Sequence, residues 1–267
     1  MAKSLVLSSL LLALLLAAPL ASLADNNVLL TGDVLHTDNQ LSFESAAFVM
    51  QGDCNLVLYN EAGGFQSNTH GRGVGCTLRL NNFGQLEIHS ANSNTPVWVS
   101  LRNGIPVRGD YAAVLGPDQH VTIYGPAIWS TPAPNRHERG ATVSNIPRVR
   151  NVLFSSQVMS DNAQLATRDY SLVMRDDCNL ALTKGSKTNI VWESGTSGRG
   201  QHCFMRLGHT GLIEISDDRL NTVWRSNTVG QEGDYVLILQ INGQAVVYGP
   251  AVWSTASPAR GGASAAL

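Results

Sequence analysis

Short runs of alternating apolar and polar residues recur along this chain, separated by clusters of Gly, Asn, Asp and Pro. Because side chains on a β-strand point alternately to its two faces, such runs predict half-buried strands. The clearest runs are 51–59, 81–89 and 116–124. Each is followed by a turn and a further predicted strand, with which it pairs: 64–69, 96–100 and 127–131, respectively. No amphipathic helical stretch of useful length is present, so the pattern predicts an all-β protein.

The chain also repeats itself, with an offset of about 124 residues. QLSFESAAFVMQGDCNLVLY at 40–59 returns as QLATRDYSLVMRDDCNLALT at 164–183, with nine of twenty residues identical. YGPAIWST at 124–131 returns as YGPAVWST at 248–255. Within each copy, the three strand pairs predict three similar sheets with three-fold pseudo-symmetry. We expect the tryptophans to meet at the centre, with Phe65 in that role in the first sheet.

The repeat and the composition divide the chain into five segments. They are a leader at 1–24, a first domain at 25–131, a linker at 132–148, a second domain at 149–257 and a tail at 258–267. In the leader, Lys3 precedes an apolar run that ends in small residues, which is typical of a secretory signal peptide. A membrane anchor is the alternative, but the run is short for a bilayer span. The linker contains RHERG, an exposed basic sequence that a protease could cut.

Charge and histidine usage narrow the function. The net charge is −2 and only 14% of the residues are charged, so no basic stripe predicts a nucleic-acid partner. Beyond the leader, no apolar run is long enough for membrane insertion. The seven histidines form no H-E-x-x-H motif and no Cys/His cluster, so we expect no metal, no cofactor and no catalytic residues. A catalytic set drawn from distant positions remains open.

Secretion would permit disulfide bonds. The four cysteines allow three pairings, and one cysteine pair in each copy favours Cys54–Cys76 and Cys178–Cys203. Each bond would close a loop of a little over 20 residues, worth roughly 3 kcal/mol in the chain-entropy model.

One strand carries candidate binding chemistry on a single face. The row at every second position is Gln51, Asp53, Asn55, Val57 and Tyr59. If the run is a strand, Cys54, Leu56 and Leu58 face the core and this row faces outward. A carboxylate, two amides and a phenol suit the hydroxyl groups of a hexose, and the valine suits its ring carbons. A solvated polar face is the alternative.

The residues QGDCNLVLY match the Q-x-D-x-N-x-V-x-Y signature of the monocot mannose-binding lectins, the snowdrop-agglutinin-like or bulb-type lectins. The resemblance extends over both copies, through DNNVL, VWRSNT and YGPAIWST, and is greatest to tandem two-domain members from aroid storage organs. It implies two β-prism II domains, each with three four-stranded sheets. It also implies metal-free binding of α-mannosyl groups of high-mannose glycans and glycoproteins, with Asp53 and Asn55 reading the axial 2-hydroxyl.

The resemblance further implies homo- or hetero-oligomers, a C-terminal strand exchanged between domains, an extracellular or vacuolar location, and a defence or storage role. Carried over to the other five rows, it predicts that none is intact. We expect weak carbohydrate binding at most at Asp118 and Tyr124 of the first domain, and at Asp177, Asn179, Gln240, Asn242, Gln244, Val246 and Tyr248 of the second. In the first domain the second row is Asn81, Phe83, Gln85, Glu87 and His89, and the third is Gly116, Asp118, His120, Thr122 and Tyr124. The second row has lost the Asp and the Tyr. The third keeps Asp118 and Tyr124 but lacks both amides.

The second domain is altered further. Its rows are Arg175, Asp177, Asn179, Ala181 and Thr183; then Gly208, Thr210, Leu212, Glu214 and Ser216; then Gln240, Asn242, Gln244, Val246 and Tyr248. We expect weak binding at most in the first row, which keeps Asp177 and Asn179, and none in the second. The third row keeps polar groups but no charge, and a charge-assisted hydrogen bond is about twice as strong as a neutral one. A protein-interaction, taste-modifying or storage protein with eroded sugar sites is the alternative function.

Overall fold

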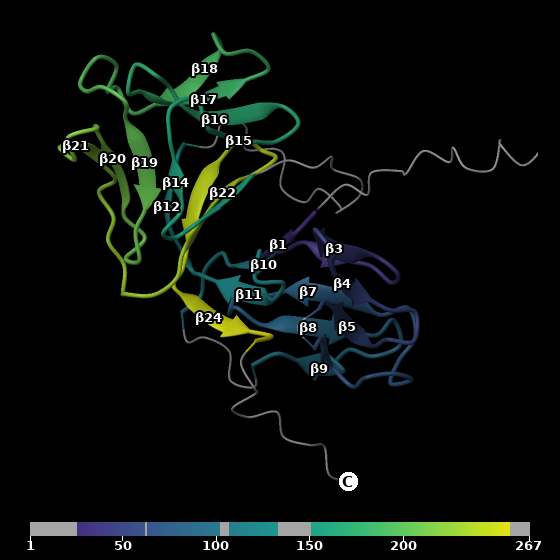
Figure 1. Cartoon of the computed structure of the whole chain (residues 1–267). Coiled ribbons are helices and arrows are strands. Elements are labelled where there is room, and N and C mark those ends of the chain that lie inside the picture. Colours follow the sequence, from purple (N-terminus) through teal and green to yellow (C-terminus); the bar gives the residue numbers. More distant parts are fainter. Residues whose placement is uncertain (1–25, 62, 102–106, 133–150, 257–267) are drawn as a thin grey trace, which may run out of the picture.

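The structure is a computed structural model that describes residues 26–61, 63–101, 107–132 and 151–256. The predicted leader at 1–24, nearly all of the predicted linker and the predicted tail at 258–267 lie outside these residues. The described chain forms 24 strands arranged in six four-stranded antiparallel sheets, three in each of two lobes (Figure 1). The all-β prediction with three four-stranded sheets per domain is therefore confirmed.

Two sheets of the first domain are built from consecutive segments. The first contains β3 (Gln40–Phe43), β4 (Ala46–Met50), β5 (Leu56–Tyr59) and β6 (Phe65–Gln66) in that order. The second contains β2 (Val34–Leu35), β7 (Thr77–Leu80), β8 (Leu86–His89) and β9 (Trp98–Val99). Alternation sets the inward face, since Ala46, Phe48 and Met50 of β4 are buried and the residues between them are less so.

The second domain repeats both sheets. Its first sheet contains β15 (Gln164–Ala166), β16 (Tyr170–Met174), β17 (Leu180–Lys184) and β18 (Ile190–Glu193). Its second sheet contains β14 (Val158–Met159), β19 (Phe204–Leu207), β20 (Ile213–Ser216) and β21 (Thr222–Arg225).

The third sheet of each domain takes its last strand from the other copy. In the first domain the order is β1 (Val28–Leu30), β10 (Ala112–Leu115), β11 (Val121–Tyr124) and β24 (Ala251–Ser254). In the second it is β12 (Ala127–Ser130), β23 (Ala245–Tyr248), β22 (Val236–Leu239) and β13 (Val152–Phe154). Figure 1 shows the yellow β24 beside the teal β11, in the lobe opposite to β22. The exchange implied by the family resemblance thus takes place within one chain.

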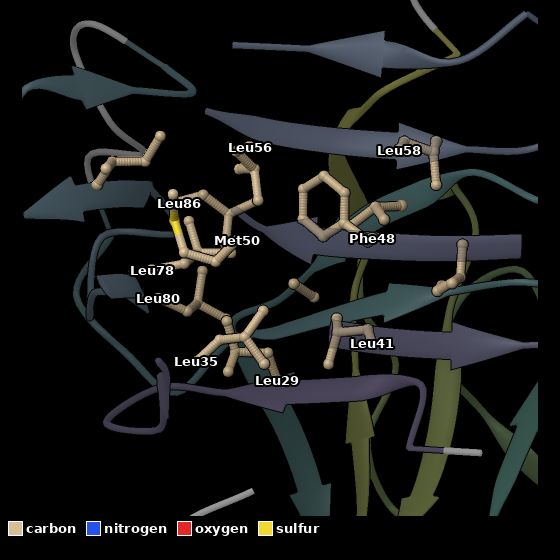
Figure 2. Packing of buried hydrophobic residues seen from close by; sticks show 14 of the residues in the cluster. Leu29, Leu35, Leu41, Phe48, Met50, Leu56, Leu58, Leu78, Leu80 and Leu86 are labelled. Atoms are coloured by element: carbon tan, nitrogen blue, oxygen red, sulfur yellow. The ribbon is translucent and has the colours of Figure 1, made fainter. Parts of the chain in front are cut away.

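Leucines from all three sheets fill the core of the first domain, together with Phe48 and Met50 (Figure 2). At the open side of this core, Phe65 contacts Trp98 and the exchanged Trp253, with ring centroids 6.0 and 5.9 Å apart. In the second domain Trp192 contacts Trp224 and the exchanged Trp129 in the same way, at 6.2 and 6.0 Å. The predicted central aromatic clusters are confirmed, and each receives one tryptophan from the other copy.

The two third sheets pack face to face and join the domains. Their outer faces form one apolar cluster, which consists of Val28, Ala112, Val114, Tyr124, Val236, Ile238, Val246 and Tyr248. The outer faces of the other four sheets are not part of this cluster. The domain contact therefore covers one row in each domain.

Candidate functional site

The Gln51 row, defined as Gln51, Asp53, Asn55, Val57 and Tyr59, begins in a tight turn and ends on β5. The expectation of one extended strand over 51–59 is wrong, because β5 begins only at Leu56. The backbone N–H of Cys54 donates to Gln51 O at 3.0 Å, and that of Gln51 donates to Asn55 O at 2.9 Å. Cys54 adopts a positive φ of 70° in this turn, and its side chain is fixed by the disulfide to Cys76. The turn brings the start of the row back toward its end.

Hydrogen bonds fix the side chains of Asp53 and Asn55, and one polar atom of each side chain has no hydrogen-bond partner among the described residues. Asp53 Oδ1 accepts from the backbone N–H of Asn55 at 2.8 Å. Asn55 is only 7% exposed, and its Oδ1 accepts from Ser67 Oγ and from the backbone N–H of Thr69, both at 3.1 Å. Since a backbone N–H can only donate, the amide nitrogen Nδ2 must face the other way. No described protein group contacts Asp53 Oδ2 or Asn55 Nδ2 within hydrogen-bonding distance.

Gln51 and Tyr59 close the other side of the row. Gln51 Nε2 donates to the Tyr59 hydroxyl oxygen at 2.7 Å, so the phenol proton remains available to a ligand. Tyr59 is 52% exposed, and Val57 beside it is partly exposed. The Gln51 row thus offers an acceptor, amide and phenol donors and a small apolar surface within one shallow site.

The Asn81 row (Asn81, Phe83, Gln85, Glu87, His89) is bonded to itself. Asn81 Nδ2 donates to Gln85 Oε1 at 2.8 Å and to Glu87 Oε1 at 2.7 Å. Glu87 Oε2 lies 2.8 Å from His89 Nε2. The amide and carboxylate groups of this row that could bind hydroxyls therefore already have partners within the row.

The Gly116 row (Gly116, Asp118, His120, Thr122, Tyr124) leads into the domain contact. Thr122 donates to Ser254 of the exchanged β24 at 3.1 Å. Tyr124 is 7% exposed within the apolar cluster, and burial raises its pKa well above the usual value, with Asp118 and Asp234 adding to the shift. Tyr124 is therefore enclosed in the domain contact, whereas the side chain of Asp118 remains 61% exposed.

The Arg175 row (Arg175, Asp177, Asn179, Ala181, Thr183) has the same turn as the Gln51 row, with Cys178 at a φ of 68°. Arg175 Nη2 reaches past β17 and donates to the carbonyl of Lys187 at 2.7 Å. Ala181 and Thr183 are buried, whereas their counterpart Val57 is partly exposed and Tyr59 is 52% exposed. The surface that could pack against a sugar ring is therefore missing here.

The Gly208 row (Gly208, Thr210, Leu212, Glu214, Ser216) carries one carboxylate, and it is fully engaged. Glu214 Oε2 accepts from Arg225 Nε at 2.8 Å, and Oε1 accepts from Ser216 Oγ at 3.1 Å. Both oxygens of the Glu214 carboxylate therefore already have partners within the protein.

The Gln240 row (Gln240, Asn242, Gln244, Val246, Tyr248) keeps the Gln–Tyr contact at 2.6 Å. However, Val246 and Tyr248 are only 5% and 2% exposed, because they belong to the apolar domain contact. Gln244 Nε2 donates to the carbonyl of Thr131 from the exchanged segment at 3.3 Å. The tyrosine hydroxyl is thus directed into the protein, which does not favour the weak binding predicted for this row.

A hydroxyl residue two positions after each central aromatic was missed by sequence reasoning, although it repeats six times. In every sheet its side-chain oxygen accepts from a backbone N–H at the start of the neighbouring strand, at 2.9–3.1 Å. The six residues are Ser67, Ser100, Thr131, Ser194, Ser226 and Thr255. The pattern aromatic-x-Ser/Thr was visible in the sequence as FQS, WVS, WST, WES, WRS and WST. In the Gln51 row this residue also orients Asn55.

Metal ligation and membrane crossing can each be judged in the part of the chain that the structure describes. No group of three or more His, Cys, Asp or Glu side chains there is arranged to hold a metal ion. The same residues contain no helix long and apolar enough to cross a membrane.

Comparison with known proteins gives close relatives. No family model matches the chain. A mannose-specific lectin from Crocus vernus is 95% identical over 259 residues, which cover 97% of this chain and 98% of that protein. A mannose-specific lectin from Colocasia esculenta is 44% identical over 231 residues, which cover 86% of this chain and 85% of the relative.

A solved structure agrees over both domains. The native fetuin-binding agglutinin of Scilla campanulata, a two-domain lectin, superposes with a TM-score of 0.76 and 32% sequence identity, covering 86% of this chain and 99% of that one. The likeness includes both domains and their relative arrangement.

Proposed function

We propose that this chain, which belongs to the monocot mannose-binding, bulb-type lectins, binds α-mannosyl groups of glycans through the Gln51 row, without a metal ion. One observation carries the proposal. Asp53 Oδ2 and Asn55 Nδ2 have no hydrogen-bond partner among the described residues, and the same row carries an exposed tyrosine whose hydroxyl oxygen already accepts from Gln51. A sugar hydroxyl can donate to the carboxylate and accept from the amide at the same time.

Rigid orientation makes this arrangement selective. The Asn55 amide cannot rotate without losing its bonds to Ser67 and Thr69. A hexose whose hydroxyl points elsewhere would therefore leave Asp53 and Asn55 partly unpaired, and an unpaired polar group costs about 1–3 kcal/mol. We expect discrimination between mannose and glucose of roughly 10- to 100-fold from this term, since each 1.4 kcal/mol is a factor of ten.

Isothermal titration with methyl α-mannoside tests the proposal. Asp53→Asn keeps an oxygen for the Asn55 N–H but removes the charge, and we expect at least a tenfold loss of affinity. Asp177→Asn is the matched control at the same position of the second domain, and it should leave binding unchanged. Binding by the Asp53→Asn variant at wild-type strength would refute the assignment, and absence of binding by the wild type would refute the lectin function.

Among the described residues, Ser156, His209 and Asp234 of the second domain have the arrangement that comes nearest to a catalytic triad. Ser156 Oγ lies 2.6 Å from His209 Nε2, and His209 Nδ1 lies 3.2 Å from Asp234 Oδ1. However, the His209 and Asp234 side chains are 51% and 67% exposed, so water screens their interaction.

The backbone N–H groups of Ser156 and Gln157 already donate to Leu207 O and Phe154 O, so neither can stabilise an oxyanion. We therefore infer that the chain acts by binding and is not an enzyme. A fluorophosphonate probe should label Ser156 no faster than it labels other exposed serines. Rapid labelling that His209→Asn abolishes would contradict this inference.

We also infer passage through the secretory pathway. Both disulfides lie in turns that shape a row, and such bonds persist in oxidising compartments. Fusion of residues 1–24 to a reporter protein should direct it out of the cytosol, and a cytosolic reporter would count against this location. A defence or storage role is an expectation from the family alone, and an insect-feeding assay with the Asp53→Asn protein as control would test its defence part.

A further inference from the structure

The two Asp–Asn rows, one in each domain, have the same scaffold. In the second domain Asn179 Oδ1 accepts from Ser194 Oγ at 3.0 Å and from the backbone N–H of Thr196 at 3.2 Å. Ser67 and Thr69 make the same two contacts with Asn55. In both domains the amide nitrogen is therefore turned outward. The identity of Asp and Asn alone cannot explain why one row is open and the other is not.

The outward atoms differ in their partners. Asn179 Nδ2 donates to Glu193 Oε2 at 2.8 Å, and Asp177 Oδ2 accepts from Ser197 Oγ, also at 2.8 Å. Both hydroxyl-reading atoms of the Arg175 row are thus bonded within the protein. The corresponding atoms of Asp53 and Asn55 have no such partner among the described residues.

The residues that make the difference lie outside the five-residue signature. Glu193 is opposite Ala181 across β17 and β18, and Gln66 is opposite Val57 across β5 and β6. Gln66 therefore occupies the position of Glu193. His70 likewise occupies the position of Ser197. Each precedes a glycine, Gly71 or Gly198, whose backbone N–H donates to the backbone carbonyl of Asp53 or Asp177, respectively. Gln66 and His70 are both exposed, and neither is hydrogen-bonded to the side chain of Asp53 or Asn55.

We propose that positions 66 and 70 of the first domain, and 193 and 197 of the second, determine whether the outward Asp and Asn atoms of a row are open to a mannosyl hydroxyl. We call Glu193 and Ser197 an internal latch. Glu193 accepts the amide hydrogen of Asn179, and Ser197 donates to the carboxylate oxygen of Asp177, so both groups that a sugar hydroxyl would use are occupied. A ligand must break a charge-assisted hydrogen bond to Glu193 before it can bind. The inference rests on the proposed function of the Gln51 row and adds the residues that control access to it.

Transfer of the latch into the first domain tests the proposal. Gln66→Glu combined with His70→Ser leaves all five residues of the Gln51 row unchanged. We expect methyl α-mannoside to bind at least tenfold more weakly by titration calorimetry, with the melting temperature nearly unchanged. In the NMR spectrum the Asn55 side-chain amide should move toward the position of the Asn179 amide, which reports the new hydrogen bond directly.

The matched control is Gln66→Ala with His70→Ala, which removes both side chains without adding a latch. It should bind within threefold of the wild type. Wild-type affinity of the Glu/Ser variant would overturn the latch, and so would an equal loss in the Ala/Ala control, because Gln66 or His70 would then contact the sugar. Asp53→Asn in the same series distinguishes failure of the latch from failure of the proposed function. If this variant binds methyl α-mannoside as the wild type does, the Gln51 row is not the binding site and the proposed function itself is refuted.

Discussion

Trp253→Ala tests the strand exchange, because this residue belongs to the second copy by sequence and to the first domain by contact. The Trp253 ring meets Phe65 edge-on with centroids 5.9 Å apart, and it packs on the core of the first domain. An aromatic pair contributes about 0.5–1.5 kcal/mol beyond its buried area. Complete loss of a buried aromatic side chain costs about 3–5 kcal/mol. Since Trp253 is only partly buried, we expect about 3 kcal/mol.

Hydrogen exchange with mass spectrometry locates that loss. A change of about 3 kcal/mol in the opening free energy corresponds to roughly a hundredfold faster exchange. The affected amides should lie in β11, to which β24 is paired, and in the adjoining β10. Trp129→Ala is the matched control and should instead accelerate exchange in β22 and β23. If Trp253→Ala accelerated exchange mainly in β22 and β23, each C-terminal strand would belong to its own domain and the exchange would be refuted.

Two further predictions concern the site support and the domain contact. Ser67→Ala should destabilise the protein by about 1–3 kcal/mol in urea unfolding, because the Leu56 N–H loses its acceptor, and should weaken mannoside binding about tenfold, because Asn55 loses one of its two anchors. Ser194→Ala should cost similar stability with no effect on binding, and equal affinities of the two variants would contradict the role of Ser67. Burial raises the pKa of Tyr124 and of Tyr248 above the usual value of about 10, so their contribution to stability is complete below about pH 10 and declines as the pH rises further. Urea unfolding at pH 8 and pH 10.5 should show a smaller decline for Tyr124→Phe/Tyr248→Phe than for the wild type, and an identical decline would show that these phenols are not responsible.

The sequence predicted the fold well because the repeat, the strand alternation and the central aromatics depend on local pattern. The tandem sheets and the aromatic clusters follow from that pattern, and the structure joins the same cysteine pairs that the repeat favours. The pattern paired 116–124 with 127–131, and this pairing is wrong, because β11 pairs with β24 and β12 pairs with β23. AIWS and AVWS fit either third sheet equally well, so the local pattern could not reveal the exchange. Only the family resemblance implied the exchange.

The candidate site was predicted less completely. The five residues of the Gln51 row are brought together, but by a turn that folds Gln51 back onto Tyr59, which alternation along one strand does not predict. The groups that decide whether a row is open come from other segments: Ser67 orients Asn55, and Glu193 occupies the amide of Asn179. Such contacts depend on strand register, which the residues of the row do not reveal.

The number of open rows determines what one chain can do to a multivalent target. A single shallow site that reads a few hydroxyls suggests a dissociation constant near 1 mM, equivalent to about −4 kcal/mol. Cross-linking of glycan particles requires at least two sites on one molecule. A chain isolated as a monomer by size exclusion should therefore bind mannan without precipitating it.

Two chains joined by a flexible linker should precipitate mannan, and their apparent affinity for it should rise by about 10²–10⁴ through effective concentration alone. Affinity for methyl α-mannoside should stay the same per site, because that ligand occupies one row at a time. Asp53→Asn in only one of the two joined chains is the matched control and should abolish precipitation while leaving half of the sites. Precipitation by the monomeric single chain would mean that a second row binds mannose, and the closed state of the Arg175 row would be the first inference to fail.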